Sequence, residues 1–220
     1  MTNRILLLTI LLLASISLQA QKAKIYEGNF DALVGEKELV VEFTYDDLVV
    51  GKKSENDYVT EKVEEKNKEE AGTGDVWLER WVDDRDERFE PKFIELFNKQ
   101  VKEKGLEITR RSETAKYKLL VWTTKMEPGF NVGIVRRNAH INVEYWLYDI
   151  ATEEILAKAK MEKIQGQGGM GLDFEVARRM EESYAKGGKS FGKFLRKKVL
   201  KENKMKKGKK KKGKKKKRKN

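Results

Sequence analysis

The chain contains no cysteine and only one histidine, His140, in 220 residues. Without cysteine it forms no disulfide, so its stability has to come from the burial of an apolar core. One histidine without cysteine does not supply the ligands of a zinc site. A catalytic triad would have to use His140, and no G-x-S-x-G motif accompanies it. We therefore expect no metal ion, no cofactor and no enzymatic activity.

Long hydrophobic runs are also lacking. The run Ile5–Leu13 is too short to span a bilayer, which takes about 20 residues. It follows Arg4 and leads into small and polar residues that end at Ala20, which is typical of a secretory signal peptide over residues 1–20. Leu18 departs from the usual cleavage pattern, which leaves an uncleaved anchor as the alternative, and the lack of cysteine argues against a lipid anchor. We expect an exported protein, periplasmic or associated with the outer membrane and soluble after cleavage.

Acidic residues are missing from the C-terminal end, and this absence locates the basic charge of the chain. Lysine and arginine total 48 against 36 aspartate and glutamate, a net charge of +12, and 13 of the basic residues lie in Lys204–Asn220. Removing those 13 from +12 leaves residues 1–203 at −1. The folded part is therefore near neutral, and the basicity belongs to the tail.

The lysine-rich tail holds one apolar residue, Met205, and its like charges repel, so we expect residues 204–220 to be extended and disordered. In an exported protein its partners would be anionic lipid or lipopolysaccharide surfaces, and we expect no specific nucleic acid. A solvated tail without a specific partner is the alternative. The residues predicted to bind polyanions are Lys209, Lys210, Lys211, Lys212, Lys214, Lys215, Lys216, Lys217, Arg218 and Lys219.

Apolar and polar residues alternate most regularly in residues 137–163. This alternation predicts two antiparallel strands, joined by the polar turn Asp149–Glu154, with one face on a core. The small side chains of Ala157 and Ala159 leave room for a helix to approach that face. The residues expected to point inward are Ile141, Val143, Tyr145 and Leu147 in the first strand, and Ile155, Ala157, Ala159 and Met161 in the second.

The other elements are predicted from the period of the apolar residues, from helix-capping residues and from glycines. Ser54 starts a predicted surface helix with a capping box, and Gly105 ends a second helix. The predicted order of strands and helices is Leu39–Leu48, a helix from Ser54, a helix over Pro91–Lys104, Leu106–Arg111, Tyr117–Lys125, the hairpin, and a long helix from about Asp173. We predict a single α+β domain over residues 21–203. Its sheet is antiparallel or mixed, with about five strands and with helices packed on one face.

Two glycine motifs flank the last helix. Residues 166–171 match G-x-G-x-x-G, but no strand follows them as a dinucleotide site requires, so we expect a flexible connection. Gly187 and Gly188 interrupt the helix, which predicts either a kink or a close approach to the strand that carries Ala157 and Ala159.

The acidic group Asp83–Glu90 stands before Pro91, which suits the first turn of a helix. Its spacing fits no EF-hand loop. Acidic side chains are favoured at a helix N-terminus by the helix dipole, so we interpret the group as structural. Paired carboxylates for hydrolysis are the alternative.

One loop and two aromatic residues are candidates for a contact surface. The loop Glu127–His140 combines an aromatic ring with cationic side chains, and two more rings lie on the polar face of the hairpin. An ordinary exposed loop, and rings that cover the edge of the sheet, are the alternatives. The candidate residues are Phe130, Arg136, Arg137, His140, Trp146 and Tyr148.

Three stretches carry a resemblance. Residues 74–98 (GDVWLERWVDDRDERFEPKFIELFN), 127–142 (EPGFNVGIVRRNAHIN) and 183–198 (SYAKGGKSFGKFLRKK) are similar to motifs of an exported Bacteroidota family with no assigned function. The order of elements also resembles periplasmic α/β domains of outer-membrane lipoproteins, such as activators of penicillin-binding proteins and the curli secretion factor. The resemblance implies a fold and a compartment and brings no catalytic residues.

The function predicted from these features is that of a non-enzymatic binding or assembly module of the cell envelope. Its partner would be another envelope protein, and the basic tail would add attraction to anionic surfaces. The alternative is an envelope hydrolase that uses acidic residues or His140.

Overall fold

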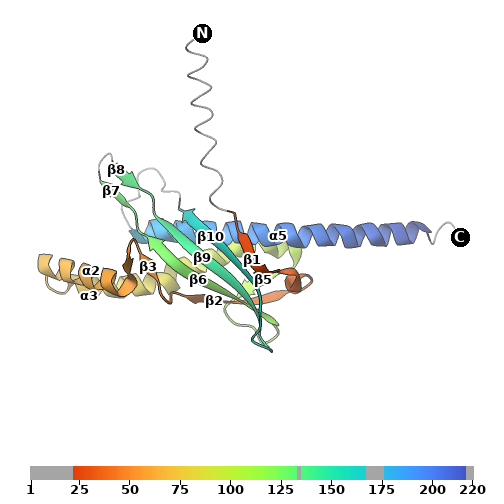
Figure 1. Ribbon diagram of the computed structural model, residues 1–220, viewed down its shortest axis with the longest axis horizontal. Helices are drawn as coiled ribbons and strands as arrows, with labels where there is room; N and C mark the ends of the chain where they lie inside the picture. The colour runs from red at the N-terminus through yellow and green to blue at the C-terminus, as the bar shows by residue number, and fades with distance from the viewer. Residues whose placement is uncertain (1–21, 133–134, 167–175, 217–220) are drawn as a thin grey trace, which may run out of the picture.

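The computed structural model describes residues 22–132, 135–166 and 176–216, without the side chains of 131–132, 135–136 and 198–216 (Figure 1). The predicted signal peptide lies outside the described residues, as does the G-x-G-x-x-G loop except for Gly166. None of the described helices combines the length and the apolar character needed to cross a membrane.

The fold is α+β, as predicted, and its main sheet is mixed. Strand β2 runs parallel to β5 and β6, β3 runs parallel to β6, and the other pairs are antiparallel. The sheet order is β1-β10-β9-β6-β2-β5, with β3 joined to β6 and β4, so its eight strands exceed the five predicted. The additional strands are short or lie at an edge, where periodicity gives little signal. The strands are β1 (Lys24–Gly28), β2 (Glu38–Thr44), β3 (Val49–Val50), β4 (Lys53–Ser54), β5 (Glu107–Thr109), β6 (Tyr117–Glu127), β9 (His140–Asp149) and β10 (Ile155–Gln165).

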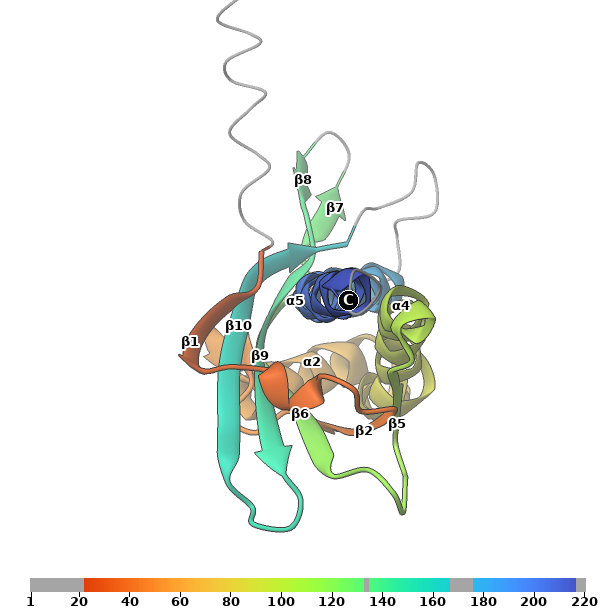
Figure 2. The same ribbon diagram turned by 90° about the vertical axis from the view of Figure 1, so that its right-hand side faces the viewer.

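Helices pack on one face of this sheet, and no described helix covers the other face (Figures 1 and 2). Helices α4 and α5 lie against each other, α5 also lies against β9 and β10, and α4 lies against β5. A separate two-stranded ribbon, β7 (Phe130–Val132) with β8 (Val135–Arg137), precedes β9, so Arg137 belongs to this ribbon and not to the long hairpin. The helices are α2 (Glu55–Glu69), α3 (Thr73–Asp84), α4 (Glu90–Val101) and α5 (Val176–Lys216), with single turns at Asp31–Leu33 and Lys102–Lys104.

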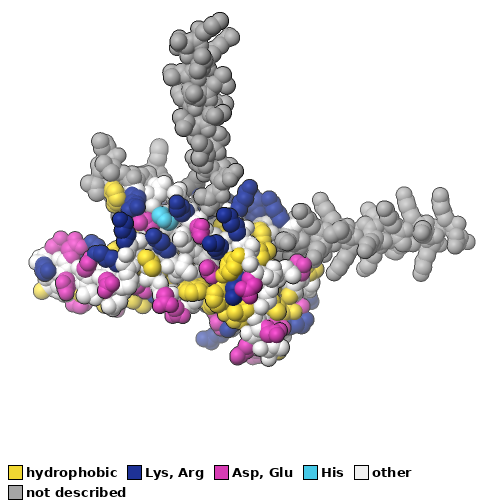
Figure 3. Space-filling view, viewed as in Figure 1, with side chains coloured by type: hydrophobic (Ala, Val, Ile, Leu, Met, Phe, Trp, Pro, Cys, Tyr) yellow, Lys and Arg dark blue, Asp and Glu magenta, His cyan; other side chains and the backbone are white. Residues whose placement is uncertain are grey.

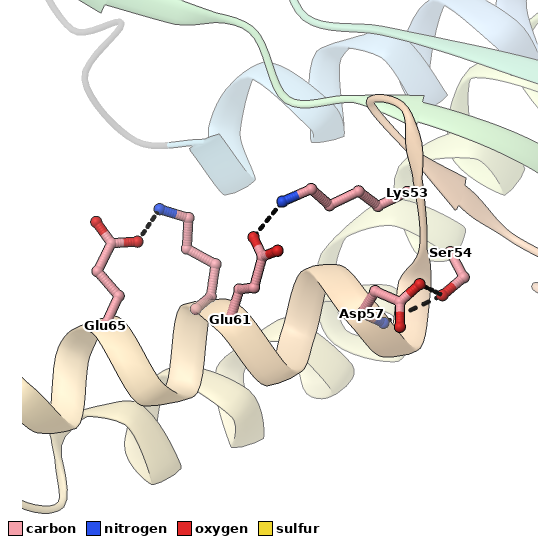
Figure 4. Close-up of polar contacts among 6 residues, drawn as sticks. Lys53, Ser54, Asp57, Glu61 and Glu65 are labelled. Carbon is pink, nitrogen blue, oxygen red and sulfur yellow. Dashed lines mark hydrogen bonds and ion pairs between the residues drawn. The ribbon is translucent and has the colours of Figure 1, made fainter.

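The start of α2 confirms the predicted cap. The backbone N–H of Asp57 donates to Ser54 Oγ at 3.1 Å, and Ser54 Oγ donates to the Asp57 carboxylate at 2.7 Å (Figure 4). This reciprocal pair satisfies one free N–H of the first turn. Lys53 and Glu61 form an ion pair on the same side (Figure 4), and no residue of α2 is buried, as expected of a surface helix.

The sequence suggested that the acidic group Asp83–Glu90 precedes a helix, but the group lies within a continuous helical run. Helix α3 continues through a π-helical segment, Arg85–Phe89, directly into α4, and its end residues all keep helical backbone angles. Pro91 fits inside this run because a π-helical turn leaves a local gap in the usual pattern of backbone hydrogen bonds. The helix dipole therefore does not explain these carboxylates; three of them, Asp84, Asp86 and Glu90, form ion pairs with arginines.

The core lies between the helices and the inner face of β6, β9 and β10. The inward residues of β9 are fully buried, as predicted, and the ring of Tyr145 stacks on that of Phe191 of α5 with centroids 3.8 Å apart. On β10, Ala157, Ala159 and Met161 are buried, but the expectation for Ile155 was wrong. A β-bulge shifts the register between Ile155 and Ala157, and this turns the Ile155 side chain to solvent.

Gly188 of α5 makes the close approach that its sequence position suggested, but to α4 and not to the alanine-lined strand. A Cβ atom at Gly188 would lie 2.2 Å from the backbone oxygen of Phe93, and one at Gly192 would lie 2.9 Å from that of Phe97. The two glycines are four residues apart, so they form one smooth strip along α5. This strip lets the backbones of α4 and α5 come close.

The backbone of α5 continues as a helix to Lys216, which differs from the disorder expected for residues 204–220. Lysine has a good intrinsic helix propensity, and the helix is already nucleated by its packed first half. The side chains of the ten predicted polyanion-binding residues, Lys209 to Lys219, lie outside the described residues, so their role stays a prediction.

Candidate functional site

The predicted contact surface separates into two regions of the molecule. Phe130 and Arg137 pair across the β7–β8 ribbon, close to His140 at the start of β9. Trp146 lies six residues further along the same strand, roughly 20 Å away at about 3.3 Å per residue. The ribbon end and the aromatic rings are therefore not one surface. The side chain of Arg136 is outside the described residues.

The described part of the ribbon end has few polar side chains placed for catalysis or ligand binding. His140 is half-buried, and burial lowers the pKa of its imidazole below the ordinary value, so the ring is neutral at pH 7. Its strand partner Glu127 is 3.6 Å from Arg137, and its carboxylate accepts a hydrogen bond from the N–H of Gly129. Phe130 is 43% exposed. This end of the sheet thus resembles an ordinary exposed loop more than a reactive site.

An aromatic cluster occupies the face of the sheet that no described helix covers. We call it the outer-face cluster, and it consists of Tyr26 of β1, Trp122 of β6, and Trp146 and Tyr148 of β9. Trp122 and Trp146 meet edge to face with centroids 5.2 Å apart, and Trp146 and Tyr148 lie 6.5 Å apart. Figure 3 looks onto this face and shows hydrophobic side chains gathered among charged ones. Two predicted residues are therefore joined by two that the sequence did not single out.

Hydrogen bonds fix the rings of the outer-face cluster. Trp146 Nε1 donates to Tyr26 OH at 3.1 Å and to Glu144 Oε2 at 2.8 Å. Tyr26 OH donates to the same carboxylate at 2.6 Å, and Trp122 Nε1 donates to the backbone oxygen of Asp46 at 2.8 Å. Burial and the Glu144 carboxylate raise the pKa of Tyr26 to about 12, so this hydroxyl stays a donor over the physiological range. The rings are pre-oriented, which lowers the entropy cost of contact with a partner.

Two lysines complete the outer-face cluster. Lys158 Nζ lies 4.8 Å from the centre of the Trp146 ring and forms an ion pair with Glu27 at 2.9 Å. Lys118 Nζ lies 5.5 Å from the Tyr148 ring and forms an ion pair with Glu42 at 3.0 Å. Because both ammonium groups already have carboxylate partners, the face carries little net charge. It is suited to a neutral or mixed surface and not to a polyanion.

A second group of rings lies on the helical side and borders a cavity of about 290 Å³. Trp77 and Trp81 are four residues apart on α3, so they share one face of the helix, and their rings stack with centroids 5.4 Å apart. Trp81 Nε1 donates to Glu55 at 2.6 Å, and the same carboxylate pairs with Arg85. These contacts brace α2 against α3, which is a sufficient structural reason for the rings.

Within the acidic group, the side chains of Asp86 and Glu90 contact each other and share one arginine. Asp84 lies 3.3 Å from Arg88, Asp86 lies 3.5 Å from Arg110, and Glu90 lies 2.9 Å from the same Arg110. Among the described residues no group of three or more histidine or acidic side chains could hold a metal ion. The carboxylates are thus spread along one helical run, where arginines pair with three of them.

The fold and the site define an α+β domain with a pre-oriented aromatic face. No family model and no curated protein matches the sequence. Among solved structures, a PelC dodecamer from Paraburkholderia phytofirmans is similar with a TM-score of 0.37 and 12% identity, over 77% of this chain and 97% of that chain. A Xanthomonas campestris protein of the DUF330 family is similar with a TM-score of 0.32 and 11% identity, over 49% and 61%. These TM-scores are too low to assign a family, and the resemblance to lipoprotein domains stays a prediction.

Sequence reasoning missed Tyr26 and Trp122 for identifiable reasons. Tyr26 lies in a segment, Lys22–Lys37, that carries no clear alternation, and its pairing with β10 is set by contacts far along the chain. Trp122 lies in the segment Tyr117–Lys125, whose two faces are both apolar, so the sequence does not tell which face is the outer one. The register of β6 with β9, which puts Trp122 opposite Glu144, decides that this face is the outer one.

Proposed function

We propose that the protein is a non-enzymatic binding module of the cell envelope whose outer-face cluster contacts a partner protein. The observation that supports this most directly is a set of four rings, joined by hydrogen bonds or by edge-to-face and tilted ring contacts, on a sheet face without a described helix cover. Partly exposed tryptophan and tyrosine rings are enriched at the centres of protein interfaces. Held in fixed positions, they lose little entropy on contact.

The chemistry of the face favours a protein over a polyanion as the partner. Lys118 and Lys158 are each paired with a carboxylate, so an anionic polymer would gain little from them. The rings present apolar area with a few fixed donors, which matches the mixed surface of another protein. An assembly partner in the envelope fits both the face and the predicted export.

Replacing Trp146 with alanine is expected to weaken partner binding about tenfold, because central tryptophans carry more than 1 kcal/mol in most interfaces. The measurement is quantitative capture of the partner from envelope extract on the immobilised protein, followed by titration of the captured partner. Trp77→Ala on the helical side is the matched control and should retain capture. Equal loss in both variants, or no loss in Trp146→Ala, would contradict the proposal.

The tail adds a second, electrostatic contact in this proposal. Removing residues 204–220 is expected to weaken association with anionic vesicles about tenfold at physiological salt and to flatten the salt dependence, because 13 positive charges are lost. Flotation with vesicles at several salt concentrations measures both effects. A variant with every tail lysine changed to arginine keeps the charge and should associate normally. Association that survives the deletion unchanged would remove the tail from the proposal.

A further inference from the structure

A groove lies between α4 and α5, the two helices that Figure 2 shows side by side on the helical face of the sheet. Its volume is about 460 Å³. Leu96 of α4 and Ala185 of α5 line it with apolar surface. Lys186, Lys189 and Lys193 line it with ammonium groups, and Glu182 lines it with one carboxylate. The lysines are three and four residues apart, so helical geometry places them on one face of α5. We call this feature the basic groove.

The three lysines of the basic groove outnumber Glu182, the carboxylate that lines it with them. No carboxylate of a described residue forms an ion pair with Lys186, Lys189 or Lys193. Glu95, on the neighbouring face of α4, is shared by Lys92 at 2.8 Å and by Lys99. The charges of α4 are therefore largely paired, and those of α5 are not. The groove differs in this respect from the outer-face cluster, where both lysines are paired.

Lys186 is the least exposed lysine of the set. It is only partly exposed, and burial alone lowers the pKa of its ammonium below the ordinary value. Removing an ammonium from water without a counter-ion destabilises its charged form, and a bound anion would reverse this effect. Ser190, which also lines the groove, adds a hydroxyl that can donate a hydrogen bond.

The basic groove is formed before any ligand binds. Gly188 and Gly192 hold α5 close to α4 and leave no room for even a methyl group between the backbones. The spacing of the two helices, and with it the width of the groove, is therefore set by the core. A rigid site of this kind loses little entropy when a ligand enters.

We propose that the basic groove binds a phosphate group through the ammonium groups of Lys186, Lys189 and Lys193. Three cations beside the one carboxylate of Glu182 leave a positive excess in the groove, which suits an anion. Phosphate oxygens accept the strong charge-assisted hydrogen bonds that ammonium groups donate. The phosphate can belong to a lipid headgroup or be free in solution. The inference deepens the proposed attraction of the C-terminal region to anionic surfaces, because the groove and the tail lie on the same helix, α5.

The placement of the groove allows both contacts at once. The helices lie on one face of the sheet and the outer-face cluster on the other (Figure 2). A phosphate-bearing surface under α4 and α5 would leave the aromatic rings free for the protein partner. The domain would then have a defined orientation on the surface, which a tail alone does not provide.

The test uses the full chain with Lys186, Lys189 and Lys193 all changed to glutamine. The matched control changes Lys37, Lys52 and Lys68 to glutamine, which removes the same charge from exposed positions without a described ion pair. Vesicles of phosphatidylcholine with phosphatidic acid probe the lipid source, and inorganic phosphate, followed by NMR shifts of residues 185–193, probes the free source. We expect the groove variant to bind the vesicles at least about tenfold more weakly than the control variant.

The possible results distinguish free phosphate from a lipid headgroup, and a specific site from a general effect of net charge. Saturable shifts with inorganic phosphate that vanish in the groove variant would show that free phosphate suffices, while selective loss of vesicle binding without such shifts would assign a lipid headgroup. Equal weakening in groove and control variants, or no weakening in either, would overturn the inference and leave only net charge. Because the tail deletion is measured separately, the groove can fail while the tail's role stands, and neither result affects capture through Trp146.

Discussion

Replacing Gly188 with alanine is expected to lower the free energy of unfolding by about 3 kcal/mol, the upper range for overpacking in a core. The new methyl group would lie 2.2 Å from the backbone oxygen of Phe93 and 2.9 Å from its carbonyl carbon. Neither atom can move away without shifting α4 as a whole. The rings of Phe93 and Phe97 behind that backbone are fully buried, so any separation of the helices would loosen the core.

The neighbouring residue provides the control for this prediction. A Cβ atom at Gly187 would meet the Tyr145 hydroxyl oxygen at 3.5 Å, an ordinary contact. Gly187→Ala should therefore keep the stability or raise it by up to about 1 kcal/mol, because alanine favours the helix. Urea unfolding of both variants measures the difference. Similar midpoints for the two variants would show that the helix contact is not as close as the backbone geometry implies.

The core of this protein is largely predictable from its sequence, because burial imposes a period on the residues that supply it. Tyr145 and Leu147 alternate with polar residues, and both are fully buried. Ser54 marks the start of its helix because its side chain caps the first turn through local hydrogen bonds. Gly105 marks the end of another helix, where its φ of 82° favours glycine. In each case the physical cause lies within a few residues of the signal.

The predictions that were wrong depend on contacts that are distant in the chain. Ile155 continues the alternation of β10, but a bulge against β9 turns it outward. Gly188 was correctly read as a point of close approach, but α4 and the alanine-lined strand are equally plausible neighbours until the fold places α4 beside it. The continuous helix across Pro91 likewise depends on a π-helical turn that has no local signature.

The candidate site shows the same limit. The alternation of β9 places Trp146 and Tyr148 on one face, and the sequence alone predicts that. What makes them a cluster is Tyr26 from β1 and Trp122 from β6, which are brought in by the order of strands in the sheet. The basic groove is similar: the spacing of the lysines is visible in the sequence, while the wall formed by α4 is not.

Stability is expected to fall as the pH rises from about 4.5 to about 7, because of one buried carboxyl group. Burial, together with the neighbouring Asp86 carboxylate, raises the pKa of Glu90 from 4.5 to about 7 against the opposing effect of Arg110. Between the two pKa values the folded state binds more protons than the unfolded state, so each pH unit costs stability. A shift of this size corresponds to about 3 kcal/mol, and Glu90 is only 5% exposed, so solvent screens it little.

Glu90→Gln should remove this dependence. The Tyr45 hydroxyl donates a hydrogen bond to Glu90 at 3.2 Å, and a glutamine amide oxygen can accept the same bond. Because glutamine never becomes charged, the variant should be more stable than the wild type at pH 8 and equally stable near pH 5. Glu95→Gln is the control: its two lysines lower the pKa of Glu95 to about 2, so the group is ionised at both pH values. That substitution should change stability equally at pH 5 and pH 8. Denaturant unfolding of the wild type and both variants at the two pH values measures these differences. If the stability difference between the wild type and Glu90→Gln were the same at pH 8 as at pH 5, Glu90 would be ionised in the fold and held by Arg110.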